Sequence, residues 1–478
     1  MGGVCTGVAS REVVRPEGFG ATPADFFSPA IKAGGWVFVS QQLATEFRGG
    51  LALRARPDPE SPYICDALEL QARFIMEEIR AILRAAGCNI ASDVVRVNQW
   101  FASDRPDAAG FETGDYWPHV DSVSSYVTAR NAVMNAPSPT TTSVSVRELL
   151  IRGALVGVDV LAVDSRTTPP EPLSLPLDLP PLPFGGAIRA GEWLFVTGQT
   201  PSDFRGDWMR KRNMGAPSGV APEARANPHL WLETEIELQT RDTLRRLEAI
   251  AEGLGTSLER CAKAVVYLGH PRDYVGFERI WKEWFPTRPP ARVVVPFTGL
   301  AIRGIKIEID ALFLTGDSEL AIEPVETSDA PEPLGHQPQA NRVGPFVFFS
   351  SQLPIDSEGR VPGELRGESE MPYFSAPTRL QLRRLLENVS AIADAARTSL
   401  EHTCKVTSFH SGFQEFPHFI EEWRKFFPAD PPALSSVRIG GGFLLVPYAN
   451  LMLDVVGYVP AEAASRRATG AEAGGPSN

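Results

Sequence analysis

The sequence predicts an α+β protein made of three tandem copies of one domain, each a mixed β-sheet covered by two helices. Three observations support this prediction. A turn-and-strand motif ending in Gln occurs three times, a helix with an apolar face follows each motif, and an alternating apolar stretch ends each copy. Such repeats indicate one structural unit used several times. The length of 478 residues suits about three domains.

The repeated motif opens each copy. It reads IKAGGWVFVSQQ at residues 31–42, AIRAGEWLFVTGQ at 187–199 and ANRVGPFVFFSSQ at 340–352. Glycine fits the tight turn between two short strands, and Gln closes the second strand. Trp36 and Trp193 stand at corresponding places, so we interpret them as packing residues.

A helix, a strand, a second helix and two final strands follow in each copy. Apolar residues at spacings of three and four predict the long helices at 73–87, 242–255 and 382–396. The second helices are aromatic and end in WKEWFP (281–286) and WRKFFP (423–428), with a looser version expected around DYWPHV (115–120) in the first copy. The last strands carry an acid at corresponding positions, namely Asp159, Asp310 and Asp454.

Proline-rich segments separate the copies, and we interpret them as extended surface linkers. The tail is rich in Ala, Gly and Ser and is predicted to be disordered. The predicted organisation is an N-terminal extension (1–20), three domains (21–163, 184–316 and 335–460), linkers at 164–183 and 317–334, and a tail (461–478).

Composition narrows the class of protein. A net charge of -12 argues against a nucleic-acid partner, because polyanion binding draws on clustered Lys and Arg. We identify no apolar run of about 20 residues, as a membrane span needs, and no secretory signal. The five cysteines have no paired spacing, which is typical of a reduced, cytoplasmic protein.

The stretch PPARVVV at 289–295 carries the main chemical signal. Arg292 stands at the start of a predicted strand, and Glu308 follows on the next one. We expect a turn between the two strands to bring both side chains to one cleft. A guanidinium offers paired donors to a carboxylate, and a carboxyl group orients water and transfers protons.

The other two copies lack this pair. The first has Thr141 and Gly157 at the corresponding positions, and the third has Leu434 and Met452. The sequence therefore predicts one cleft of this kind, and not three.

Arg292 and Glu308 also have purely structural interpretations. An arginine at a strand start is often half of a surface ion pair, and Glu308 with Asp310 fits a solvated strand face. We identify no HExxH or CxxC motif, so we expect no zinc site. We identify no convincing GxGxxG or P-loop motif, so we expect no nucleotide cofactor.

These motifs resemble those of the RidA/YjgF family, whose fold is chorismate mutase-like. The resemblance covers nearly the whole chain apart from the linkers and termini. It is strongest in the second copy, with TGQ (197–199), WKEWF (281–285), PPAR (289–292) and IEID (307–310). The family usually forms homotrimers with clefts between subunits. The resemblance thus implies an intramolecular pseudo-trimer with clefts between the copies.

The resemblance also implies roles for residues. Arg292 would hold a substrate carboxylate, and Glu308 would position the water that attacks an imine carbon. Thr197 and Gly198 match the part of the motif that approaches the ligand.

An aromatic residue near the first strand commonly lines the cleft of this family. Phe27 and Phe184 hold similar positions here, with His336 in the third copy. The sequence does not determine which copy faces Arg292.

Three functional hypotheses follow. The first is a cofactor-independent hydrolase that deaminates an enamine, an imine or a related C–N bond in a small carboxylated metabolite, acting as a monomer or homodimer. The second is a degenerate binding or scaffold protein, favoured by the loss of two of three Arg/Glu pairs. The third is a specialised enzyme of secondary metabolism or of nitrogen-heterocycle breakdown.

Overall fold

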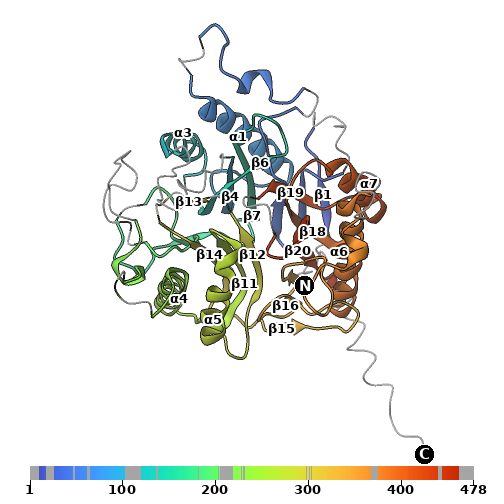
Figure 1. Cartoon of the computed structure of the whole chain (residues 1–478). Helices are drawn as coiled ribbons and strands as arrows, with labels where there is room; N and C mark the ends of the chain where they lie inside the picture. Colours follow the sequence, from blue (N-terminus) through green and yellow to red (C-terminus); the bar gives the residue numbers. More distant parts are fainter. Residues whose placement is uncertain are drawn as a thin grey trace, which may run out of the picture.

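The computed structural model contains three β-sheets with the same core strand order (Figure 1). In each, two hairpin strands are followed by the last strand of the copy, then a central strand, then a strand parallel to the central one. The structure describes residues 10–17, 26–46, 49–61, 65–102, 120–135, 138–180, 182–202, 204, 219–227, 229, 232–297, 299–300, 302, 304–367, 375–439 and 444–461.

The three sheets are mixed, as the sequence predicts. In spatial order, the first consists of β1 (Glu12–Val14), β2 (Ala30–Ala33), β3 (Trp36–Val39), β7 (Val156–Val163), β4 (Val94–Ala102), β5 (Thr140–Val146) and β13 (Gly299–Leu300). The second consists of β12 (Ala291–Pro296), β11 (Cys261–Leu268), β14 (Ile307–Leu314), β10 (Trp193–Val196), β9 (Ala187–Ala190) and β8 (Glu171–Leu173). The third consists of β15 (Ile322–Val325), β16 (Ala340–Val343), β17 (Phe346–Phe349), β20 (Leu451–Tyr458), β18 (Thr403–His410), β19 (Ala433–Arg438) and β6 (Glu148–Leu149).

Helices cover the outer faces of the sheets (Figure 1). They are α1 (Ala67–Ala85), α3 (Val120–Asn131), α4 (Glu235–Gly253), α5 (Tyr274–Trp284), α6 (Pro377–Ala395) and α7 (Phe416–Phe426). Short 3-10 turns are η1 (Leu53–Ala55), η2 (Pro222–Ala224), η3 (Leu258–Arg260), η4 (Pro271–Asp273), η5 (Gly363–Leu365) and η6 (Leu400–His402). None of these helices is long and apolar enough to cross a membrane.

The long helices begin five to seven residues before the predicted starts. Asp66 caps α1 by accepting from the N–H groups of Leu68 and Glu69. A capping box of Thr234 and Glu237 starts α4, and a proline occupies the first turn of α6. These first-turn signals are separate from apolar periodicity, so periodicity alone placed the helix starts too late. The stretch 115–119 of the looser first-copy helix lies outside the described residues.

Each linker contributes an edge strand to a sheet, which the sequence analysis did not predict. β8 and β15 lie within the proline-rich segments and pair antiparallel with β9 and β16. β1 of the N-terminal extension pairs with β2 in the same way. An edge strand tolerates proline because one of its sides needs no hydrogen-bond donors, and covering an edge removes unpaired backbone groups.

Two apolar clusters join all three sheets, in addition to the one beneath each pair of helices. In one of them the rings of Trp36, Trp193 and Phe346 lie within 4.4–6.1 Å of one another. This confirms the packing interpretation of the two tryptophans. In the other, the Trp100 ring lies 6.1 Å from that of Tyr267 and 6.0 Å from that of Phe409.

The same backbone contact joins the sheets at three junctions. The side-chain hydroxyl of the residue after a hairpin accepts a hydrogen bond from the backbone N–H of one strand residue in the neighbouring sheet. The residue that follows the hydroxyl residue donates its own N–H to the carbonyl of the same strand residue. The first–second junction joins Thr197 and Gly198 to Thr141, the second–third joins Ser350 and Ser351 to Arg292, and the third–first joins Ser40 and Gln41 to Leu434. The order of contacts is therefore closed.

Buried ion pairs follow the same closed order. A cation on the central strand of one sheet meets the aspartate on the last strand of the next. The pairs are Arg96 Nη1 to Asp310 Oδ1 at 2.7 Å, Lys263 Nζ to Asp454 Oδ1 at 2.7 Å and Lys405 Nζ to Asp159 Oδ1 at 3.7 Å. Each cation also donates to a backbone carbonyl at the end of the neighbouring hairpin. These additional bonds help offset the cost of burying the charges.

We expect Lys263→Met to lower the free energy of unfolding by about 3 kcal/mol, because it leaves Asp454 buried without its cation. Urea denaturation measures this loss. The control is Arg189→Met, which breaks the exposed pair with Asp317 and should cost less than about 1 kcal/mol. The double variant Lys263→Met/Asp454→Leu should recover part of the loss. Equal losses for Lys263→Met and Arg189→Met would contradict the prediction.

Candidate functional site

Arg292 is fully buried on β12 and already has an acidic partner. Its Nη2 donates to Glu278 Oε2 at 2.7 Å and its Nε to Gln337 Oε1 at 3.0 Å. Its guanidinium carbon lies 4.8 Å from the ring centroid of Trp281 on α5. Nη1 has no hydrogen-bond partner within the described residues. The carboxylate of Glu278 thus occupies one of the guanidinium donors that a substrate carboxylate would need for a bidentate pair.

Gly335 lies directly against the Arg292 guanidinium. Gly335 has φ +87°, and a Cβ there would lie 2.8 Å from Nη2 of Arg292 and 2.2 Å from the Tyr274 hydroxyl. Only glycine fits such a backbone this close to the guanidinium. The segment that enters the third sheet therefore covers Arg292.

Glu308 lies at a different junction. It is 6% exposed on β14, and a Cβ at Gly198 would lie 2.0 Å from its Oε1. Gly198 donates its N–H to the carbonyl of Thr141 at 3.0 Å. Burial, and then the nearby Asp310, raise the pKa of Glu308 well above its ordinary value. Among the described residues its carboxyl makes no hydrogen bond, so Glu308 is a buried acid without a hydrogen-bond partner at the first–second junction.

Arg292 and Glu308 lie on opposite faces of the second sheet. Arg292 pairs with Ala264 on β11, whereas Glu308 pairs with Tyr267 on the same strand. Positions three apart on a strand point to opposite faces. The expectation that a turn brings the two side chains to one cleft is therefore wrong. The sequence spacing suggested that the two strands are adjacent, but β11 lies between β12, which carries Arg292, and β14, which carries Glu308.

Strand register defines the corresponding positions in the other sheets. Thr141 and Leu434 occupy the Arg292 position, and Gly157 and Met452 the Glu308 position. At each junction a strand residue of one sheet faces the hairpin end of the next. The combinations at these positions are Thr141 with Glu308, Arg292 with Met452, and Leu434 with Gly157, so none of the three junctions has both the arginine and the glutamate.

The remaining predicted residues are divided between junctions. Thr197 and Gly198 lie with Glu308, and the Thr197 hydroxyl donates to the Thr141 carbonyl at 2.8 Å. Phe184 directly follows Pro183, whose carbonyl accepts from α3, so it also lies at the first–second junction. Phe27 packs on the third sheet's cluster, at the third–first junction.

The third-copy match to Phe184 is Gln337, and not His336. β9 and β16 begin at Ala187 and Ala340, so residue 184 corresponds to residue 337. Gln337 accepts from Arg292. Gln337 was not predicted as a site residue, because glutamine does not resemble the expected aromatic residue.

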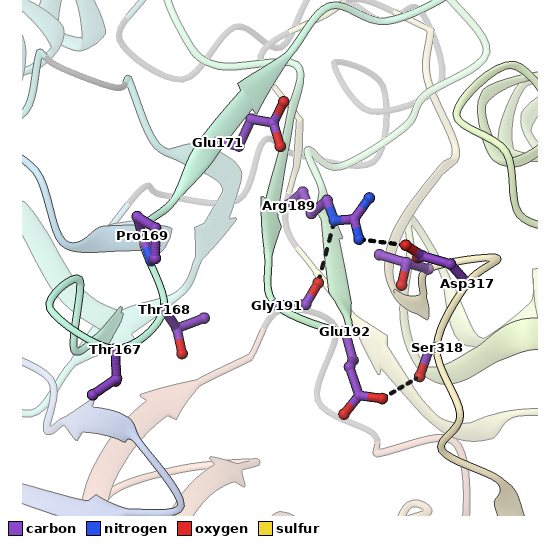
Figure 2. A pocket seen from close by; sticks show the side chains of 10 residues that line it. Thr167, Thr168, Pro169, Glu171, Arg189, Gly191, Glu192, Asp317 and Ser318 are labelled. Carbon is purple, nitrogen blue, oxygen red and sulfur yellow. Dashed lines mark hydrogen bonds and ion pairs between the residues drawn. The ribbon is translucent and has the colours of Figure 1, made fainter.

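The predicted residues are absent from the lining of two surface pockets. The pocket in Figure 2, of about 330 Å³, lies between residues 167–171 and the second sheet. Two of its charged groups already have partners: Arg189 donates to Asp317 Oδ2 at 2.7 Å, and the Ser318 hydroxyl donates to Glu192. A second pocket, of about 890 Å³, is lined largely by residues 326–332. Within the described part of the chain no cluster of His, Cys, Asp and Glu suits a metal ion.

Comparisons with known proteins agree with this architecture. The model of the family "Endoribonuclease L-PSP" matches residues 179–314 and 327–441, more than half of the chain. A RutC family protein of Pyrococcus abyssi is 32% identical over 120 residues, which cover 25% of this chain and 86% of that protein.

Two further similarities add detail. A protein of Dermatophagoides farinae named 2-iminobutanoate/2-iminopropanoate deaminase is 26% identical over 117 residues, 24% of this chain and 81% of that protein. The crystal structure of E. coli TdcF with bound serine is 27% identical and covers 28% of this chain and 98% of its own, with a TM-score of 0.24. From the extent of the family match, the chain belongs to the endoribonuclease L-PSP family, which includes the RidA/YjgF proteins that its motifs resemble.

Proposed function

We propose that this protein is a cofactor-independent deaminase that hydrolyses an imine, an enamine or a related C–N bond in a small carboxylated metabolite. The observation that carries the proposal is Glu308, a buried acid with a raised pKa and no hydrogen bond among the described residues. Perturbed acids without a structural partner are typical of functional sites. The relative named as an imine deaminase supports the same reaction class.

The proposed chemistry needs one acid and one water. The protonated Glu308 gives its proton to the imine nitrogen, and its carboxylate then takes a proton from the water that attacks the imine carbon. Proton transfer to nitrogen and loss of ammonia break the C–N bond and leave a carbonyl. The sum is imine plus water giving carbonyl plus ammonia, so no oxidant or reductant is needed.

We further propose that the chain is three tandem copies forming an intramolecular pseudo-trimer, with one working site at the first–second junction. The closed order of the three junctions and of the buried ion pairs supports this arrangement. In a single chain each residue occurs at one junction only, so the sites are free to differ.

A second candidate function is a binding or scaffold role without turnover. The ion pair between Arg292 and Glu278 favours it, because the family-like cation is neutralised from within. The separation of Arg292 from Glu308 favours it as well. Ligand binding without ammonia release in the wild type would support this alternative.

Glu308→Gln should lower the rate of ammonia release from 2-iminobutanoate, generated in the assay, by roughly 10²–10⁴-fold, as loss of a general acid does. The exposed Glu259→Gln, near the start of β11, is the matched control and should behave like the wild type. A Glu308→Gln protein with the wild-type rate would refute the proposed site.

The pH dependence of stability should also report Glu308. Folding raises its pKa above the ordinary value of 4.5. The contribution of such an acid to stability is fully present below the ordinary pKa and is lost as pH rises through the folded-state pKa. Glu308→Gln removes this loss, so the variant should gain stability relative to the wild type as pH rises from 4.5. Thermal unfolding across pH measures this, and a constant difference would show that the pKa is not raised.

Arg292→Ala separates the two junctions. Under the proposal it acts mainly on stability, because it leaves Glu278 without its buried partner, and it should cost about 3 kcal/mol. Ammonia release per folded molecule should stay within a few-fold of the wild type. If release is abolished while the protein stays folded, the working site lies at the second–third junction instead.

A further inference from the structure

The second helix of the first copy has an arginine where the other two copies have tryptophan. In each copy a side chain at the same place on this helix donates a hydrogen bond to the backbone of the segment entering the next sheet. The bonds are Trp281 Nε1 to His336 O at 3.2 Å, Trp423 Nε1 to Phe26 O at 2.7 Å and Arg130 Nη2 to Pro183 O at 2.8 Å. Residues 26, 183 and 336 each lie four positions before a hairpin strand. Arg130 therefore corresponds to the tryptophans.

A second exchange lies one turn earlier on the same helix face. Phe277 and Phe419 precede the tryptophans by four residues, and Tyr126 precedes Arg130 by the same number. All three rings are fully buried. Two aromatic positions thus become polar in the first copy while remaining buried.

Among the described residues, Arg130 and Tyr126 each have a hydrogen-bond donor without a partner. Arg130 is 1% exposed and donates to Gln99 Oε1 at 2.9 Å, to Asn131 Oδ1 from two nitrogens, and to Pro183 O. A guanidinium has five N–H groups, so one on Nη1 remains. Arg130 pairs with no carboxylate among the described residues. The Tyr126 hydroxyl is buried and has no partner there either.

This arrangement is costly without a ligand. A buried cation without an anion loses its hydration and gains no ion pair in return. Burial accordingly lowers the pKa of Arg130. Arg292, the other buried arginine beside a junction, has Glu278 as its partner. A bound oxyanion would give Arg130 the anionic partner that Glu278 gives Arg292.

The position also fits the junction that holds Glu308. There, Thr141 stands at the place of Arg292, so the strand provides no cation. In the second copy the strand guanidinium lies 4.8 Å from the Trp281 ring, so the two positions are in contact. Moving the cation from strand to helix therefore shifts it to an adjacent place. Arg130 also contacts Gln99, whose Nε2 donates to Ser143 on β5.

We propose that Arg130 and Tyr126 bind the carboxylate of the ligand at the first–second junction, with the cation supplied by α3 in place of the strand. The proposal deepens the proposed function and rests on it for the identity of the ligand. The ligand class is a small carboxylate. The groups without a hydrogen-bond partner are donors, and a guanidinium matches the planar carboxylate in shape.

The sequence of the chain itself supplies the test variants. Arg130→Trp installs the residue of the other two copies, which retains an N–H donor for Pro183 but removes the charge. Arg130→Trp/Thr141→Arg places a tryptophan on the helix and an arginine on the strand, as in the second copy, and Tyr126→Phe installs its phenylalanine. The probes are propanoate and, as the uncharged match, propanamide, with binding to the full chain measured by calorimetry.

Wild type should bind propanoate more tightly than propanamide. Arg130→Trp and Tyr126→Phe should each weaken propanoate binding by about tenfold or more, because each removes a hydrogen bond to the charged carboxylate. The double variant should recover much of the affinity. Propanamide binding should stay unchanged, which a general loss of structure would not allow. Tyr126→Phe serves as the test should Arg130→Trp fail to fold.

The outcomes separate the two proposals. Propanoate binding that depends on Arg130 without ammonia release leaves this inference standing and refutes the proposed deaminase activity. Ammonia release that depends on Glu308, with KM and propanoate affinity unchanged in Arg130→Trp, overturns the inference alone. Equal affinity of the wild type for propanoate and propanamide also overturns it.

Discussion

The junction between neighbouring sheets is the constraint on which the rest of the structure depends. Each sheet has an edge strand, and the N–H and C=O of one residue on it bond to a hydroxyl and a backbone N–H of the next sheet. Beside that seam, a buried lysine or arginine meets an aspartate of the next sheet. A charge buried this deeply is tolerated only with its partner. The relative placement of the sheets is therefore fixed by chemistry as well as by apolar contact.

The fold could be predicted from the sequence because local residue patterns determine most of its elements. Glycine turns, alternating strands and apolar helix faces each reflect a neighbour's packing, and three repeats reinforced one another. The edge strands in the linkers were not predicted, because proline content shows only that a segment is unsuited to the interior of a sheet. An edge strand such as β8, with Pro172 in it, needs little regularity and leaves almost no pattern.

The candidate site was less predictable because it is made across sheets. Arg292 and Glu308 are close in the sequence, and both match a motif, but the face of each side chain depends on strand register. Arg130 was missed for a related reason. Its significance lies in a comparison with Trp281 and Trp423, and the first copy's helix was sought around residues 115–120. The correspondence of residues 129–134 to the later helices becomes visible only once the bonds to Pro183 and its counterparts align them.

Two short strands, β13 and β6, each cover the edge of a sheet that belongs to another copy. β13 (Gly299–Leu300) pairs with β5, and β6 (Glu148–Leu149) pairs with β19. During synthesis the two edges are in unlike situations. The partner of β19 has already left the ribosome when β19 emerges, whereas β5 must wait for roughly 150 further residues before its partner exists, with its backbone groups free to pair with other chains. The order of the copies along the chain thus leaves the edge of the first sheet uncovered for longer than the edge of the third.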